Sequence, residues 1–120
     1  MMRIAVTAQD NGFNAYVDQR FGRAKCFAII DIENREIRNI DNTQNLNAKE
    51  GAGIQAAQTI ANNNASVLIT GNIGPKAYRT LNSAGIEVYI GAKGTVEKAV
   101  ESYLNGQLEK ASSDLVDGGW

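Results

Sequence analysis

The chain has 120 residues and a mass of 12.9 kDa, the size of one domain with one core. Its 12 basic and 13 acidic residues give a net charge of −1, so no overall field favours nucleic acid or an anionic membrane surface. It has no histidine and one cysteine, Cys26, which excludes an intramolecular disulfide, Cys/His zinc sites and catalytic groups that use histidine.

The first part of the chain predicts a buried strand followed by a hairpin. Residues 3–8 are apolar and partly β-branched, and the polar segment after them is typical of a turn. Residues 26–32 are apolar almost throughout, which predicts a strand covered on both faces. A polar break separates them from a second strand with little to bury. We therefore expect 26–40 to form a hairpin whose second strand is the more exposed.

The rest of the chain alternates predicted helices and strands after a polar, asparagine-rich loop at 41–50. The predicted order is helix 54–61, strand 67–70, a helix from Pro75 to the residue before Gly85, strand 86–90, and a helix capped by Thr95. The residues expected on the inner faces of these helices are Ile54, Ala57, Ile60 and Ala61; Ala77, Tyr78 and Leu81; and Val96, Ala99, Val100, Tyr103 and Leu104.

This order predicts a single α/β domain with a five-stranded mixed sheet, antiparallel in its first half and parallel in its second, flanked by about three helices. Residues 1–110 are expected to form the domain and 111–120 a loosely ordered tail, from which Trp120 could pack back. The N-terminus shows no targeting or membrane-spanning pattern, so we expect a cytoplasmic protein.

Three glycine-bearing loops follow predicted strands, at 9–12, 71–76 and 91–95. In open α/β sheets, ligands bind at the carboxyl ends of parallel strands, where helix N-termini present N–H groups. These loops predict either an anion or cofactor cradle, or simply turns that need glycine. The G-x-G-x-x-A match at 51–56 follows a polar loop instead of a strand, so it does not indicate a dinucleotide site. Residues 71–76 are too short for a Walker A loop.

The segment around the single cysteine allows two interpretations. Three basic residues lie close to it in the sequence: Arg20, Arg23 and Lys25. Nearby positive charge favours a thiolate, which would make Cys26 a soft ligand or a reactive thiol. Alternation with Ala28 and Ile30 favours a small buried apolar residue instead. The acidic residues are scattered, and no pair of them indicates acid–base or two-metal chemistry.

Several segments together resemble the dinitrogenase iron–molybdenum cofactor biosynthesis family, the NifX-like domain also found at the C-terminus of NifB. The matching segments are Ile4-Ala5-Val6, Arg20-Phe21-Gly22-Arg23-Ala24, Gly51-Ala52-Gly53, Gly71-Asn72-Ile73-Gly74-Pro75-Lys76-Ala77, Ala84-Gly85-Ile86-Glu87-Val88-Tyr89 and Gly106-Gln107-Leu108. The resemblance covers about residues 2–110 and implies a ribonuclease H-like α/β fold. A shared fold carries no nuclease activity with it.

The resemblance implies a non-catalytic protein that binds or carries an iron–sulfur or iron–molybdenum-type cofactor, or a precursor, held transiently. It implies cofactor-assembly proteins as partners; from the net charge we expect no nucleic-acid or membrane partner, and we expect a monomer. The cofactor-binding residues that it implies are Asn11, Arg20, Phe21, Gly22, Arg23, Gly71, Asn72, Ile73, Gly74 and Lys76, with Cys26 as a candidate metal ligand.

One departure from the family pattern leaves the binding mode open. Members that handle the cofactor commonly have histidine where this chain has Arg20. A cluster would therefore be ligated by Cys26, or held electrostatically by Arg20, Arg23, Lys76 and loop N–H groups. Two other functions fit the same scaffold: a sensor of a small anion or phosphometabolite at 71–76, and a protein–protein adaptor. An enzyme is not expected, because no nucleophile–base pair can be assembled.

Overall fold

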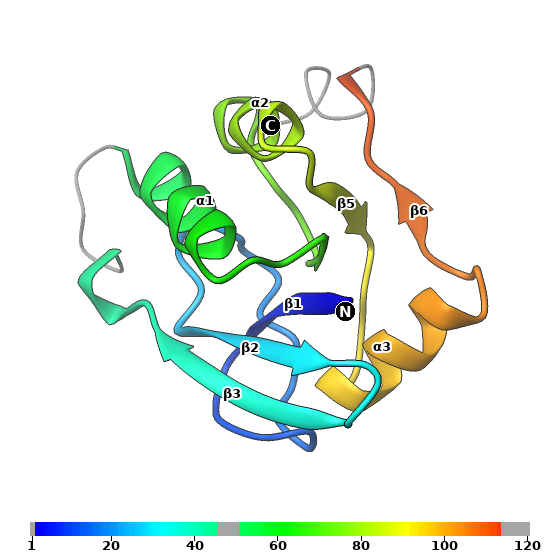
Figure 1. Cartoon of the computed structure of the whole chain (residues 1–120). Helices are drawn as coiled ribbons and strands as arrows, with labels where there is room; N and C mark the ends of the chain where they lie inside the picture. Colours follow the sequence, from blue (N-terminus) through cyan, green and yellow to red (C-terminus); the bar gives the residue numbers. More distant parts are fainter. Residues whose placement is uncertain (1, 46–50, 114–120) are drawn as a thin grey trace.

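The computed structural model describes residues 2–45 and 51–113, which form a mixed six-stranded sheet with helices on both faces (Figure 1). The strands are β1 (Arg3–Ala8), β2 (Cys26–Asp31), β3 (Glu36–Asp41), β4 (Val67–Ile69), β5 (Glu87–Ile90) and β6 (Glu109–Lys110). The helices are α1 (Ala52–Asn62), α2 (Pro75–Ser83) and α3 (Val96–Leu104), with a 3₁₀ turn at Thr43–Asn45. The strand order across the sheet is β3-β2-β1-β4-β5-β6.

The pairing of the strands confirms the predicted change from antiparallel to parallel. β1, β2 and β3 pair antiparallel, so 26–40 does form a hairpin, with β3 exposed at the edge of the sheet. β1, β4 and β5 pair parallel, and the helical connections between them provide the crossovers.

The predicted number of five strands is wrong, because β6 adds a sixth. It pairs antiparallel with β5, with Tyr89 opposite Lys110. Both of its residues are exposed, so the sequence shows no apolar alternation there. This strand is specified by its tertiary position against β5 and by the hydrogen bond from the Ala111 N–H to the Val88 carbonyl (2.8 Å).

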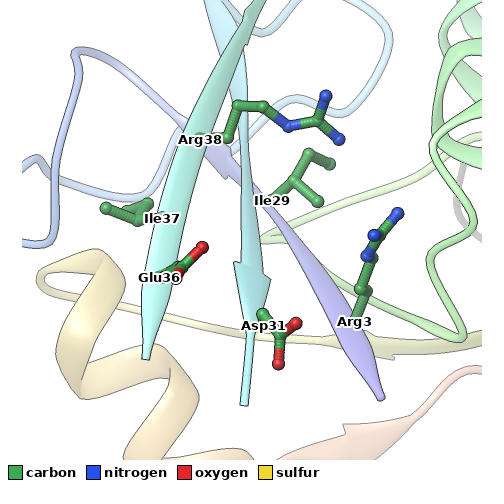
Figure 2. A pocket seen from close by; sticks show the side chains of 6 residues that line it. All are labelled: Arg3, Ile29, Asp31, Glu36, Ile37 and Arg38. Atoms are coloured by element: carbon green, nitrogen blue, oxygen red, sulfur yellow. The ribbon is translucent and has the colours of Figure 1, made fainter. Parts of the chain in front are cut away.

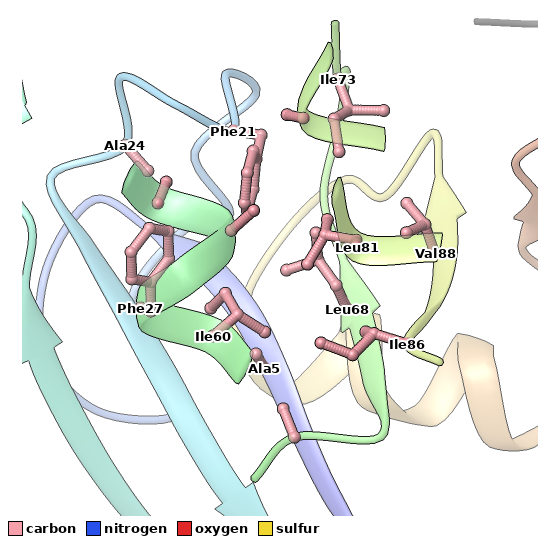
Figure 3. Close-up of a cluster of buried hydrophobic side chains, with 14 of the residues drawn as sticks. Ala5, Phe21, Ala24, Phe27, Ile60, Leu68, Ile73, Leu81, Ile86 and Val88 are labelled. Atoms are coloured by element: carbon pink, nitrogen blue, oxygen red, sulfur yellow. The ribbon is translucent and has the colours of Figure 1, made fainter. Parts of the chain in front are cut away.

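Two apolar layers lie on the two faces of the sheet. α1 and α2 cover one face, where Phe21, Phe27, Leu68 and Leu81 are among the buried side chains (Figure 3). α3 covers the other face, where the buried side chains include Ile4, Val6, Ile30 and Val100. Successive strand residues point to opposite faces, which explains why β1, β2 and β4 are apolar in nearly every position.

The predicted inner faces of the helices need two corrections. Ile54 is 38% exposed and Leu104 is 53% exposed. The buried residues of α1 are Ala52, Ala56, Ala57 and Ile60. α1 packs against α2 as well as the sheet, with Gly53 against Ala77, and this close packing selects small residues for the buried stripe. The largest apolar side chain of the first turn is therefore left outside.

The segments predicted as a loop and a tail contribute buried residues. Asn42 and Asn45, from the predicted loop, are 0% and 1% exposed. Ala111, from the predicted tail, is buried, and its carbonyl accepts a hydrogen bond from the Tyr78 hydroxyl (3.4 Å). Trp120 lies outside the described residues, as do Leu46 and the rest of 46–50. In the described part of the chain, no helix has the length and apolar character needed to cross a membrane.

Candidate functional site

The loops that follow β1 and β4 run side by side at the carboxyl ends of these parallel strands. The Asn72 N–H donates to the Gln19 carbonyl (2.7 Å), and the Phe21 N–H donates to the Asn72 carbonyl (3.2 Å). Gly71 is required for this approach, because a Cβ at that position would collide with Gln19. The structure thus places two of the predicted site segments, 20–23 and 71–74, next to each other.

A pocket of ≈ 390 Å³ opens beside these loops, and we call it the Arg23–Lys76 pocket. Its lining comes from three segments far apart in the sequence: 21–23, 52–53 and 74–77. The first is the loop after β1, and the others are the first turns of α1 and α2. Its volume is within the range of small-ligand pockets.

The two helix N-termini at this pocket have no side-chain caps. α1 begins after Gly51, which has φ 78° and a left-handed backbone conformation, and α2 begins after Gly74 with Pro75 in its first turn. Neither first turn contains an acidic residue. By contrast, the Thr95 hydroxyl caps α3 by accepting from the Lys98 N–H (3.2 Å). The uncapped ends give the pocket a partial positive charge and a local preference for anions.

Two cationic side chains add to this charge. Arg23 and Lys76 both line the pocket, and Arg23 also donates to the Asn45 carbonyl (3.1 Å), which ties the guanidinium to the 3₁₀ turn. Of five pockets formed by the described residues, this one alone is lined by no carboxylate. The arrangement is therefore suited to bind an anion without forming a covalent bond to it.

Close packing of glycine backbones holds the pocket walls together. A Cβ on Gly22 would lie 2.9 Å from the Gly53 Cα, so the loop and α1 touch backbone to backbone. A Cβ on Gly53 would lie 3.1 Å from the Ala77 Cβ, so α1 also packs closely against α2, here backbone to side chain. Phe21 anchors the loop in the core, since it is 2% exposed and packs against Phe27 with ring centroids 5.8 Å apart.

The structure brings together some of the predicted site residues and separates others. Phe21, Gly22, Arg23, Gly74 and Lys76 line one pocket. Gly71 and Asn72 lie in the loop after β4, where they contact Gln19 and Phe21, and Ile73 is buried in the core layer that α1 and α2 cover. Arg20 lines a separate pocket of ≈ 440 Å³ with Asp18 and Lys25, and its Nε lies 3.6 Å from the Asp18 carboxylate.

Cys26 and Asn11 lie together in a third pocket, of ≈ 350 Å³, with Asp10, Lys25, Asn39 and Asp41. The thiol is 5% exposed and makes sulfur contacts with the Asp10 carbonyl (3.4 Å) and the Asn39 amide (3.7 Å). Burial raises the pKa of the Cys26 thiol above its ordinary value of 9.0, although the hydrogen bond from Asn39 opposes this. Within residues 2–45 and 51–113, no group of three or more Cys, Asp or Glu side chains could hold a metal ion.

Sequence reasoning missed the contribution of α1 to the site. Ala52 and Gly53 line the pocket, and Pro75 and Ala77 complete the α2 side. The sequence feature that indicates this contribution is Gly51-Ala52-Gly53 before a helix. It is not a dinucleotide fingerprint, but it marks a helix N-terminus that another backbone or a ligand can approach closely.

A further pocket, of ≈ 270 Å³, lies at the amino end of β1, away from these loops (Figure 2). Arg3 and Arg38 line it together with Asp31 and Glu36, so its charges are mixed. Arg3 donates to the Asn63 carbonyl (3.3 Å) and Arg38 to the Asn63 Oδ1 (3.2 Å). These arginines are engaged at the C-terminus of α1, where cations stabilise a helix.

Residues 2–106 match the family described as "Dinitrogenase iron-molybdenum cofactor". An uncharacterized protein of Methanocaldococcus jannaschii is 37% identical over an alignment of 113 residues, and the match covers 92% of each chain. The solved apo form of the orange protein from Desulfovibrio gigas is 43% identical, with a TM-score of 0.90 over 93% of this chain and 94% of that one. The NMR structure of a Thermotoga protein, proposed to be NifB and assigned to the DUF35 family, is 32% identical, with a TM-score of 0.80 over 92% and 93%.

Proposed function

Because the chain belongs to the dinitrogenase iron–molybdenum cofactor family, we propose that it binds or carries an anionic iron–sulfur or iron–molybdenum-type cofactor, or a precursor, as cargo without turnover. The observation that carries this proposal is the Arg23–Lys76 pocket, where two uncapped helix N-termini and two cations meet and where none of the described lining residues is a carboxylate. The description of the Desulfovibrio gigas relative as an apo form, a protein without its bound group, supports a binding role.

The residues of the pocket favour electrostatic holding over direct ligation. Among the described residues, its lining contains no cysteine, histidine or carboxylate that could bond to iron. An anionic cluster would instead face Arg23, Lys76 and the first N–H groups of α1 and α2. Cys26 stays a proposed ligand for a second binding mode, in which its pocket would have to open, because the thiol is buried.

The partners and the cellular location that we propose follow from this carrier role. A transient carrier must receive and release its cargo, so its partners would be cofactor-assembly proteins. We also propose a cytoplasmic location and no nucleic-acid or membrane partner, since the net charge of −1 provides no general attraction to polyanions. No catalytic step is proposed.

The test is anaerobic mixing with isolated iron–molybdenum cofactor and, separately, with a synthetic cubane iron–sulfur cluster, followed by gel filtration. We expect iron and visible charge-transfer absorbance to co-elute with the protein. A double Arg23→Gln, Lys76→Gln variant should bind at least about a hundredfold more weakly, since each charged hydrogen bond contributes about 1.5–3 kcal/mol. A double Lys93→Gln, Lys98→Gln variant, which removes two exposed lysines elsewhere, is the matched control.

Two results would contradict the proposal. Absence of co-eluting iron with the native protein would exclude the cargo. If the double variant still bound the cofactor and Cys26→Ala did not, the cofactor would be held by thiolate ligation and not electrostatically.

A small-anion or phosphometabolite sensor is the second candidate, because uncapped helix N-termini also bind phosphate groups. A thermal-shift screen with phosphorylated metabolites would then show stabilisation that Lys76→Ala abolishes. A flat screen, with cofactor binding intact, would exclude this role.

A further inference from the structure

The wall of the Arg23–Lys76 pocket formed by 21–23 belongs to a loop without regular secondary structure. This loop comprises residues 20–25, the last part of the connection from β1 to β2. Buried backbone groups in such a segment need hydrogen-bond partners outside a helix or sheet. The Phe21 N–H has such a partner in the Asn72 carbonyl. Two buried polar side chains, Asp18 and Asn42, provide partners for four further groups.

Asp18 is fixed to the end of β1 through its backbone. Its N–H donates to the Thr7 carbonyl (2.9 Å), and its carbonyl accepts from the Thr7 hydroxyl (2.6 Å). The Thr7 hydroxyl is also hydrogen-bonded to the Thr70 hydroxyl of the β4 connection (2.9 Å). These three residues are at most 6% exposed, so the anchor is inside the protein.

The Asp18 carboxylate holds both ends of the loop. Its Oδ1 accepts from the Arg20 N–H (3.1 Å) and its Oδ2 from the Lys25 N–H (3.3 Å). From the other side, the Asn42 amide donates to the Gly22 carbonyl (3.3 Å) and the Ala24 carbonyl (2.8 Å). The loop is therefore clamped at four backbone groups by two side chains.

We infer that Asp18 is a positioning residue for anion binding: it holds the Phe21–Arg23 wall against α1 although its own charge opposes an anion. This inference rests on the proposed function. Asp18 does not line the Arg23–Lys76 pocket, and a carboxylate near a cationic site lowers anion affinity by charge alone. Its geometric and electrostatic contributions to binding thus have opposite signs, which makes them separable by experiment.

The native protein provides the first measurement. The amides of Arg20 and Lys25 lie in a loop, yet the Asp18 contacts should protect them from hydrogen exchange, in contrast to the exposed turn residue Asn34. Exchange of both amides as fast as that of Asn34 would overturn the inference without any substitution.

Two variants separate charge from geometry. Asp18→Asn removes the charge and places an NH₂ group opposite an N–H donor at either Arg20 or Lys25. Asp18→Glu keeps the charge but adds a methylene that displaces the carboxylate. We expect about tenfold faster exchange across 20–25 in both, and about fivefold or more weaker binding of isolated iron–molybdenum cofactor. Glu101→Gln, which removes an exposed negative charge on α3, is the control for net charge.

The alternative, a role through charge alone, gives the opposite pattern. Asp18→Asn would then bind the cofactor more tightly and Asp18→Glu would bind it as the native protein does, with exchange unchanged in both. Either result would overturn the inference. Failure of the native protein to bind the cofactor would instead overturn the proposed function, and the exchange rates of the ligand-free variants would still decide whether Asp18 holds the wall.

Discussion

Single residues shape the pocket mainly through the side chains that they lack. Gly22 and Gly53 let the loop after β1 touch the first turn of α1, and Gly71 lets the loop after β4 pass Gln19. None of these three glycines has a left-handed φ, so the requirement is space and not backbone conformation. Substitutions at these positions test the assembly of the site separately from its charges.

Gly22→Ala is expected to lower the free energy of unfolding by about 1–3 kcal/mol, because the new Cβ would lie 2.9 Å from both the Cα and the N of Gly53. Urea unfolding followed by circular dichroism measures the change. Gly12→Ala is unsuitable as a control because of its positive φ, whereas Gly74→Ala adds a Cβ in open space without positive φ. Equal stability of Gly22→Ala and Gly74→Ala would show that the backbone contact is not tight.

Cys26 provides a prediction with a definite pH dependence. Since burial raises the pKa of its thiol, alkylation by iodoacetamide at pH 7–8 should be much slower in the folded protein than in urea. The folded state binds the proton more tightly than the unfolded state does. Stability should therefore fall as the pH rises above the ordinary thiol value of 9.0, and this fall should be smaller in Cys26→Ala. Rapid alkylation of the native protein would contradict the buried position.

At the scale of secondary-structure elements, the three helices begin in two different ways. α3 has a side-chain cap and Glu97 in its first turn, as expected for a helix whose N-terminus serves stability. α1 and α2 lack both features and open into one pocket. Because α1 and α2 have no caps, they lack the stabilisation that capping gives, but their first free N–H groups stay available for an anion.

Supplying the missing cap should therefore oppose binding. Gly74 has an extended backbone, and a Cβ at this position would meet no other atom within 4 Å, so Gly74→Asp fits as an α2 cap. We expect the free energy of unfolding to rise by about 0.3–1 kcal/mol and cofactor affinity to fall at least about tenfold. Gly74→Asn, a neutral cap, should change affinity less. Thermal unfolding measures the stability and the gel-filtration assay measures the affinity. Unchanged affinity in Gly74→Asp would show that the N-terminus of α2 takes no part in binding.

At the scale of the whole molecule, the large apolar side chains that are exposed among residues 2–45 and 51–113 lie on different segments. They are Met2, Tyr16, Ile54 and Leu104, which belong to the N-terminus, the loop after β1, α1 and α3. Isolated exposed apolar residues are ordinary, whereas stable homodimers bury a contiguous apolar patch.

We therefore expect a monomer. Light scattering coupled to gel filtration should give 12.9 kDa without dependence on protein concentration. A mass of twice this value that persists on dilution would contradict the prediction and would direct attention to the β3 edge, which is the longer exposed edge of the sheet.

How far the site could be predicted depended on whether its residues were adjacent in the sequence. Phe21, Gly22 and Arg23 form one contiguous segment, and Gly74 and Lys76 another, so both segments were found. Asp18 and Asn42 were not identified, because a polar residue in a polar stretch looks solvent-exposed until the fold buries it. Similarly, Cys26 and Arg20 are close in the sequence but line different pockets, since Cys26 begins β2 and Arg20 lies in the loop before it.

The sequence by itself determined the three helices, the first five strands and their order, because hydrophobic periodicity, helix caps and turn glycines are local properties. It also determined the family. Only the tertiary structure decided the sixth strand, the burial of Asp18 and Asn42, and the meeting of three distant segments in the Arg23–Lys76 pocket. The physical reason is that parallel crossovers bring loops far apart in the chain to one edge of the sheet, where their charges and backbone groups act together.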